Sequence, residues 1–266
     1  MLDFLTHLFQ RGCGYSAINT ARSALSATGL IIDGFAVGAH PLVVRYMKGV
    51  FNLRPTKPKY STTWDVSKVL LYIRKLSPVS SLPLKLLTHK LCMLIALTLA
   101  SRSQSLHLLD VANMKKGYTG YTLCYRHLLK QARPGSGNPV AHLQAYPADR
   151  RLCVIFVLKE YLERTQHVRN NETRLFISYV KPHKAVTSST VSRWLREVMF
   201  KSGIDCEQYA THSIRSASVS KAQQNYVPIC DILKVAGWTN AQTFARFYNK
   251  PITDSNQTFA NAVLTG

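Results

Sequence analysis

Apolar residues in the first fifty positions recur with the 3.6-residue period of an α-helix. The pattern predicts a first helix that starts at Leu2 and ends before Gly12, because glycine favours the end of a helix. A second helix is predicted over 16–28. A third is predicted over 41–51, with Pro41 in its first turn, where proline is tolerated. We therefore expect the N-terminal part of the chain to be helical.

Residues 54–59 interrupt this pattern. They contain two prolines and three cationic residues, a composition typical of an extended linker. We therefore predict a domain boundary at this segment. A helical domain is expected over residues 1–58, and a larger domain over residues 59–266.

The larger domain is predicted to be built around one apolar helix. Residues 83–99 are apolar on nearly all sides, which is typical of a helix buried in a core. The helix before it is expected to start with a capping box at Thr62–Asp65. An amphipathic helix is predicted over 151–165. Thr187 is expected to cap a further helix that runs to about Lys201.

Alternating apolar and polar positions predict strands between these helices. Residues 118–127 alternate and are rich in aromatic side chains, and residues 140–146 alternate again. The glycines and prolines of 133–139 indicate a turn, so the two segments are expected to pair as a hairpin. A short strand is predicted over 175–178. The predicted fold class is therefore mainly α with a small antiparallel β-sheet.

The chain is strongly basic. It has 34 Lys and Arg against 13 Asp and Glu among 266 residues, a formal net charge of +21. A basic surface attracts polyanions, and nucleic acid is the commonest of them. The alternative is a charge excess that only keeps the protein soluble, but acidic residues serve that purpose better. The cations are spread over both predicted domains, so we expect double-stranded DNA as the partner.

The sequence argues against several other kinds of site. The six cysteines form no C-x-x-C pair, which argues against a zinc ribbon. No phosphate-binding G-x-x-x-x-G-K-[ST] motif and no carboxylate pair at metal-binding spacing occur. Ser218–Lys221 matches the S-x-x-K of penicillin-binding enzymes, but no K-T-G follows it. We therefore expect no metal and no small-molecule cofactor, and a covalent protein nucleophile if the protein cleaves DNA.

Membrane association is not expected. The longest apolar run, residues 91–100, is too short to cross a bilayer, and the N-terminus lacks a signal-like pattern. We expect a nuclear location in a eukaryote and a cytoplasmic one otherwise.

The C-terminal region gathers side chains suited to phosphate chemistry. It contains His212-Ser-Ile-Arg215, followed by Trp238 and Tyr248. A guanidinium matches two phosphate oxygens, an imidazole can move a proton, and an indole N–H can donate a hydrogen bond. A phenol becomes a nucleophile when cations stabilise its anion. Each residue also has an ordinary alternative, namely a structural histidine, a core tryptophan or a buried tyrosine.

Two further cations are candidates. Arg102 follows the apolar core helix, where a charge is costly unless it is used. The alternative is a surface arginine favoured by the dipole at a helix C-terminus. Lys130 lies beside the glycine-rich turn, where it would either protonate a departing 5′-oxygen or stay solvated and touch backbone phosphate.

The order of these residues resembles the signature of the tyrosine recombinase (phage integrase) family. The six matching positions are Arg102, Lys130, His212, Arg215, Trp238 and Tyr248. Residues 211–220 and 236–248 are most similar to recombinases of the DIRS and Ngaro retroelements. Residues 3–29 are similar to part of a Cre-type, SAM-like core-binding domain that lacks its first helix. Only residues 249–266 follow the tyrosine, which leaves little room for a long exchanged C-terminal helix.

The resemblance implies a role for each position. Tyr248 would form a 3′-phosphotyrosyl bond with DNA, and Lys130 would protonate the leaving 5′-oxygen. The scissile phosphate would be bound by Arg102, His212, Arg215 and Trp238. Rejoining would need neither ATP nor a metal ion, and a homotetramer would assemble on two duplexes.

The resemblance also suggests which residues contact DNA. The helix over 189–201 is similar to one that enters the major groove, so Arg193 and Arg196 are candidate contacts. Three further candidates lie in the first domain: Arg22, Arg45 and Lys48. One position departs from the family, because Ser105 stands where an acidic residue usually orients the first arginine.

Our hypothesis is a site-specific DNA recombinase or integrase from a mobile element. A catalytically inactive DNA-binding derivative is the first alternative, favoured by Ser105 and the short first domain. A relaxing topoisomerase with the same chemistry is the second. A basic RNA-binding protein without this chemistry is the third.

Overall fold

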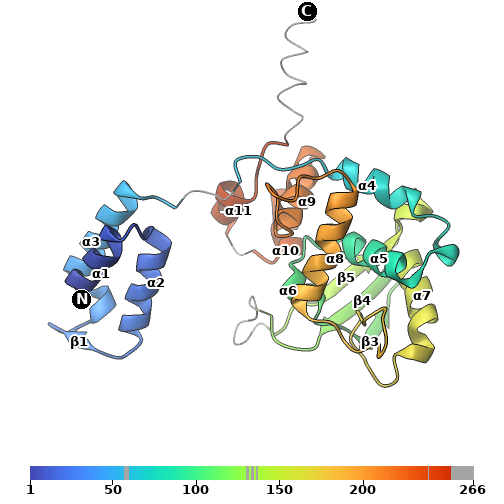
Figure 1. Ribbon diagram of the computed structural model, residues 1–266, viewed down its shortest axis with the longest axis horizontal. Helices are drawn as coiled ribbons and strands as arrows, with labels where there is room; N and C mark the ends of the chain where they lie inside the picture. The colour runs from blue at the N-terminus through green and yellow to red at the C-terminus, as the bar shows by residue number, and fades with distance from the viewer. Residues whose placement is uncertain (57–59, 130–131, 133–134, 136, 239, 253–266) are drawn as a thin grey trace, which may run out of the picture. The chain divides into compact units, whose positions relative to one another are not determined.

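The chain folds into two compact units, Met1–Lys59 and Tyr60–Gly266. The computed structural model describes residues 1–56, 60–129, 132, 135, 137–238 and 240–252 (Figure 1). Among these residues, no helix combines the length and the apolar character needed to cross a bilayer. The predicted fold class, mainly α with a small antiparallel sheet, is confirmed.

The first unit is a three-helix cluster. Its elements are α1 (Leu2–Gln10), α2 (Tyr15–Ser26), β1 (Ile31–Ile32), β2 (Phe35–Ala36), the 3-10 turn η1 (Val37–Ala39) and α3 (Pro41–Leu53). The helices bury Leu5, Ile18, Val43, Met47 and Val50 against one another. All three were predicted from the periodicity, whereas the β1–β2 hairpin was not.

Arg54 closes this unit after its last helix. Its guanidinium donates hydrogen bonds to the carbonyls of Phe9 and Cys13, at 2.7 and 3.0 Å, and lies 3.8 Å from the centre of the Phe9 ring. A cation that was predicted to belong to the linker therefore joins the end of α3 to the end of α1.

The second unit contains a three-stranded antiparallel sheet. Its strands are β3 (Leu109–Lys116), β4 (Gly120–Tyr125) and β5 (Ala141–Gln144), in the order β3-β4-β5. The predicted hairpin is confirmed by the β4–β5 pair, in which Leu123 lies opposite Ala141. Strand β3 was not predicted. Residues 175–178 form no strand, because Arg174 and Ile177 make only isolated bridges to other segments.

Most of the remaining elements of the second unit are helices. They are α4 (Val66–Lys75), α5 (Leu84–Thr98), α6 (Ser103–Leu106), α7 (Val154–Thr165), α8 (Ser188–Lys201), α9 (Ser213–Gln224), α10 (Ile229–Ala236) and α11 (Ala241–Phe247), with 3-10 turns η2 (Val79–Ser81), η3 (Arg150–Leu152) and η4 (Gln166–Val168).

Helix α5 is the centre of the second unit. Residues 87–96 are all buried, and the helix packs against α7, α8 and α9, as predicted for an apolar core helix. Thr187 caps α8 as expected, by accepting from the Thr190 N–H. The predicted start of α4 was wrong by three residues. Asp65 is itself the cap, because its carboxylate accepts from the Ser67 N–H at 2.9 Å.

One titratable side chain lies in the core between α5 and α8. His89 is 2% exposed, and its ring centre lies 5.8 Å from that of Trp194 and 5.7 Å from that of Tyr179. Burial lowers the pKa of His89 to about 4. Its nearest carboxylate, Glu197, accepts from Lys85 and Lys201 at 2.9 Å each. His89 is therefore neutral in the folded protein at any pH near 7.

This burial predicts a loss of stability in mild acid. Between pH 6.5 and about 4 the unfolded chain binds a proton at His89 and the folded chain does not, so the free energy of unfolding falls as the pH is lowered. The slope should reach at most about 1.4 kcal/mol per pH unit. In urea denaturation, His89→Phe should have a shallower slope than the wild type between pH 6.5 and 5.

His167→Phe is the matched control, because His167 is exposed. Burial also lowers the pKa of His107, which is present in all three proteins and contributes to each slope. The contribution of His89 is therefore the difference in slope between the wild type and His89→Phe. Equal slopes for the wild type and His89→Phe would contradict this account.

Candidate active site

Arg215 is the buried centre of the candidate site. It lies in the first turn of α9 and is only 3% exposed. Its Nη1 donates to the Ala100 carbonyl at 2.9 Å, and its Nη2 donates to the Ala236 carbonyl. Ala100 follows the end of α5, and Ala236 is the last residue of α10. One guanidinium therefore joins the C-terminal ends of two helices to the start of a third.

Arg102 lies in the turn after α5, two residues beyond the carbonyl that accepts from Arg215. Ala100 adopts a left-handed conformation with φ 44°, and the Ser101 N–H donates back to the Ala96 carbonyl at 3.1 Å, which ends the helix. Arg102 follows as the N-cap residue of α6 and is partly exposed. Burial, and next the charge of Arg102, lower the pKa of Arg215 to about 10. Arg215 therefore stays charged at neutral pH, so the site repels cations and attracts an anion.

The end of α10 places Trp238 over this charge. Gly237 ends the helix in the left-handed region with φ 65°, and the Trp238 N–H donates a hydrogen bond to the Leu233 carbonyl at 2.9 Å. The Arg215 Cζ atom lies 4.3 Å from the Trp238 ring centre. An aromatic face over a guanidinium is a favourable electrostatic contact, and it covers one side of the cation from water.

Tyr248 completes the cluster from the end of α11. Its ring centre lies 4.3 Å from that of Trp238 and 5.5 Å from the Arg215 Cζ atom. Its hydroxyl lies 3.2 Å from Nε2 of His212, the N-cap residue of α9. Its nearness to Arg215 acts against burial and Arg102 and raises the pKa of the arginine, which favours the charged form. Figure 1 shows that α9, α10 and α11 lie together, which brings these distant positions to one place.

The arrangement is suited to attack on a phosphodiester. Two guanidiniums stabilise charge on the non-bridging oxygens of a phosphate and on a phenolate. The imidazole lies within hydrogen-bonding distance of the phenol, so it can accept the phenolic proton or donate to the phosphate. Tyr248 is partly exposed and His212 is exposed, so a DNA backbone can approach them. The structure thus brings His212, Arg215, Trp238 and Tyr248 into contact, and it places the charge of Arg102 near enough to act on Arg215.

Two positions singled out from the sequence need separate comment. Lys130 lies outside the described residues. Ser105 lines a cavity that Arg215 also lines, together with Ser101 and Tyr125. Within the described part of the chain, Nε of Arg215 is buried and has no hydrogen-bond partner. The family resemblance implies a carboxylate at position 105 that orients the first arginine. Ser105 has a short hydroxyl side chain and no carboxylate, so it cannot take that role.

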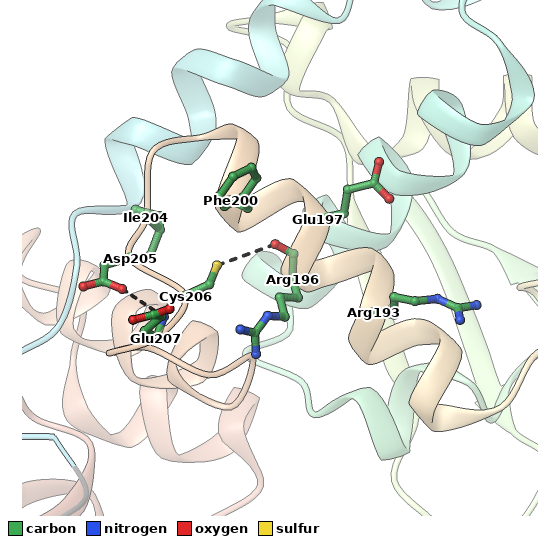
Figure 2. A pocket seen from close by; sticks show the side chains of 8 residues that line it. All are labelled: Arg193, Arg196, Glu197, Phe200, Ile204, Asp205, Cys206 and Glu207. Atoms are coloured by element: carbon green, nitrogen blue, oxygen red, sulfur yellow. Dashed lines mark hydrogen bonds between the residues drawn. The ribbon is translucent and has the colours of Figure 1, made fainter.

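The candidate DNA contacts lie on three helices. Arg193 and Arg196 are exposed on α8, where they line an open groove (Figure 2). Figure 2 shows Arg196 pointing toward the turn at Cys206 and Glu207, and Arg193 pointing away from it. In the first unit, Arg45 and Lys48 are exposed on α3, and Arg22 is partly buried on α2.

Sequence reasoning missed two residues beside the site. Ser216 and Ser220 of α9 both donate to the backbone carbonyl of Tyr248, at 3.0 Å each. Their spacing of four residues places them on one helical face. That spacing is visible in the sequence, but the carbonyl they bind is known only from the packing of α9 against the end of α11.

Comparisons with known proteins identify the fold. No protein-family model matches the sequence, and no curated protein sequence matches it. Among solved structures, XerA recombinase is similar over 99% of this chain and 90% of its own, with a TM-score of 0.54 and 15% identity. The Tn1549 transposon integrase bound to transposon right end DNA is similar over 99% of this chain and 84% of its own, with a TM-score of 0.55 and 15% identity.

A lambda integrase dimer bound to a COC′ core site is also similar. It covers 94% of this chain and 78% of its own, with a TM-score of 0.52 and 15% identity. At these identities the comparisons show the fold alone. The expectation of a tyrosine recombinase fold is therefore confirmed.

The left-handed residue at the end of α10 leads to a prediction for the site. Gly237→Ala should lower the free energy of unfolding by about 1–2 kcal/mol, because a Cβ is strained at φ 65°. Gly237→Asn should lower it less, because asparagine tolerates this conformation. Urea denaturation of the three proteins measures the difference. Equal costs for alanine and asparagine, or no cost for alanine, would show that the turn does not constrain Trp238.

Proposed function

We propose that this protein breaks and rejoins DNA strands through a covalent bond between Tyr248 and a 3′-phosphate. One observation supports this function above all. The Tyr248 hydroxyl lies 3.2 Å from His212 Nε2, and its ring lies beside the buried guanidinium of Arg215. A tyrosine that only packed in the core would not be expected to have its hydroxyl beside an imidazole and its ring beside a buried guanidinium.

The proposed reaction uses each of these groups. Arg102 and Arg215 bind the non-bridging oxygens of the scissile phosphate and stabilise the charge that grows on them. The phenol oxygen attacks phosphorus while His212 takes its proton or donates to the phosphate. The bond from phosphorus to the 5′-oxygen breaks, a 3′-phosphotyrosyl bond forms, and the leaving oxygen takes a proton from a general acid.

Lys130 is our proposal for that general acid, on the family resemblance. Rejoining is the reverse reaction, in which a 5′-hydroxyl attacks the phosphotyrosyl bond and releases the phenol. One ester replaces another in each direction. The energy of the diester is therefore kept, and the reaction needs no ATP and no metal ion.

DNA binding is proposed to use both units. The net charge of +21 supports a partner with many phosphates. Arg193 and Arg196 are exposed on α8, which we propose enters the major groove. Arg22, Arg45 and Lys48 are proposed to contact the backbone from the first unit. A lambda integrase tetramer bound to a Holliday junction shares this fold, which supports a homotetramer for this chain.

The biological setting is also a proposal. The Tn1549 transposon integrase shares the fold, and the C-terminal sequence resembles DIRS and Ngaro recombinases. Both support a mobile-element recombinase, which would act in the nucleus of a eukaryotic host. The second candidate is a catalytically inactive DNA-binding derivative. It is favoured by Ser105 and by the unpartnered Nε of Arg215 within the described residues.

A covalent trapping experiment tests the proposed function. Duplexes that bind the protein are first selected from a random pool and then rebuilt with a nick near each candidate cleavage position, so that a released fragment diffuses away. The wild type should form a protein–DNA adduct that survives denaturing electrophoresis. Tyr248→Phe should form none, because it lacks the attacking oxygen.

Tyr226→Phe is the matched control, because Tyr226 is 94% exposed. It should form the adduct like the wild type. Tight binding without any adduct from the wild type would support the inactive derivative. An adduct that persists in Tyr248→Phe would place the nucleophile elsewhere.

A further inference from the structure

We propose that Ser216 and Ser220 are positioning residues that hold the Tyr248 nucleophile on helix α9 of its own chain. The proposal rests on the function proposed above. It adds that the tyrosine is placed through its backbone carbonyl.

The contact is a pair of hydrogen bonds to one oxygen. Ser216 Oγ and Ser220 Oγ each donate to the Tyr248 carbonyl at 3.0 Å. Ser220 Oγ also accepts from the Lys250 N–H at 3.1 Å. The two serines are 6% and 3% exposed, so water competes little for these bonds. We call this set of three hydrogen bonds the serine clamp.

The clamp supplies hydrogen-bond donors to a backbone carbonyl at the end of a helix. Helix α11 ends at Phe247, so the carbonyl of Tyr248 has no partner in a following helical turn. The two hydroxyls use both lone pairs of that carbonyl. They fix the position of the tyrosine backbone while leaving the phenol free to face His212 and the phosphate.

The clamp also links the nucleophile to the phosphate-binding arginine. Ser216 follows Arg215 directly on α9, and His212 caps the same helix. One rigid helix therefore carries the proposed proton acceptor, the proposed phosphate ligand and the holder of the attacking residue. A small displacement of the tyrosine carbonyl would change the distance between the phenol oxygen and the phosphorus, on which the rate of attack depends steeply.

Contacts on both sides of Tyr248 keep its segment in its own chain. Before it, Phe244 is 2% exposed and packs with Ala100, Val219 and Ile232. After it, the Thr63 N–H donates to the Pro251 carbonyl at 2.9 Å, and Thr63 pairs with Ile252 in a parallel bridge. These contacts hold the segment beside α9, where the two serines bind the Tyr248 carbonyl.

The first test compares cleavage with binding in serine variants. The double variant Ser216→Ala, Ser220→Ala should form the covalent adduct at least tenfold more slowly than the wild type, with DNA affinity within about twofold, because phosphate affinity is distributed over many cations. Ser220→Thr keeps a hydroxyl and should be nearer to the wild type than Ser220→Ala. Equal adduct rates in the double variant and the wild type would overturn the proposal.

Ser218→Ala is the matched control on the same helix. Its hydroxyl donates to the Ile214 carbonyl of α9 itself, at 2.9 Å. It should leave the adduct rate unchanged. A loss in Ser218→Ala equal to that in the double variant would mean that any serine lost from α9 slows the reaction, and would also overturn the proposal.

Hydrogen exchange tests the clamp without relying on activity. The Lys250 amide should exchange at least tenfold faster in Ser220→Ala than in Ser218→Ala, because its acceptor is removed. Unchanged exchange would show that the clamp does not form in solution. If the wild type forms no adduct but exchange responds as expected, the clamp stands and the proposed function fails.

Discussion

The site depends on a buried positive charge that must find acceptors. Arg215 is nearly inaccessible to water, and a guanidinium in such a place is costly unless its N–H groups are bonded. The carbonyls at the ends of α5 and α10 meet part of this need, and the rings of Trp238 and Tyr248 cover it. Both helix ends must therefore come to one point, and this requirement brings Arg102 and the C-terminal tyrosine into the same place.

Helix α9 carries the parts that have to stay in register. His212 begins it, Arg215 lies in its first turn, and Ser216 and Ser220 hold the tyrosine backbone. Because these positions share one rigid element, their spacing is set by helical geometry and not by loops. The remaining parts, Arg102 and Trp238, come from helix ends whose left-handed residues, Ala100 and Gly237, reverse the chain toward α9.

Much of the fold was predictable because most elements follow a regular period. The apolar periodicity of α1 to α3, the largely apolar α5 and the cap at Thr187 were all visible in the sequence. Strand β3 was missed because its pairing with β4 is irregular between Asp110 and Lys115, which disturbs the alternation of sides. The β1–β2 hairpin could have been found, since Asp33-Gly34 is a turn signal and both residues have positive φ.

The residues of the candidate site were predictable from their types and order, but their geometry was not. The chemistry of arginine, histidine, tryptophan and tyrosine can be read from single positions. The carbonyls that receive Arg215 and the serines that hold Tyr248 depend on how α5, α9, α10 and α11 pack. No local pattern encodes a bond from a side chain to a distant backbone carbonyl, so these contacts required the structure.

The most direct test of the central claim is the cleavage rate of Arg215→Lys beside its DNA affinity. Lysine keeps the charge but cannot reach two carbonyls and a phosphate together. Single-turnover adduct formation should fall by about 10²–10³-fold, the range seen when one donor to a developing negative charge is removed, while affinity changes only a few-fold. Retained cleavage, or an equal loss of cleavage and binding, would contradict the role given to this buried guanidinium.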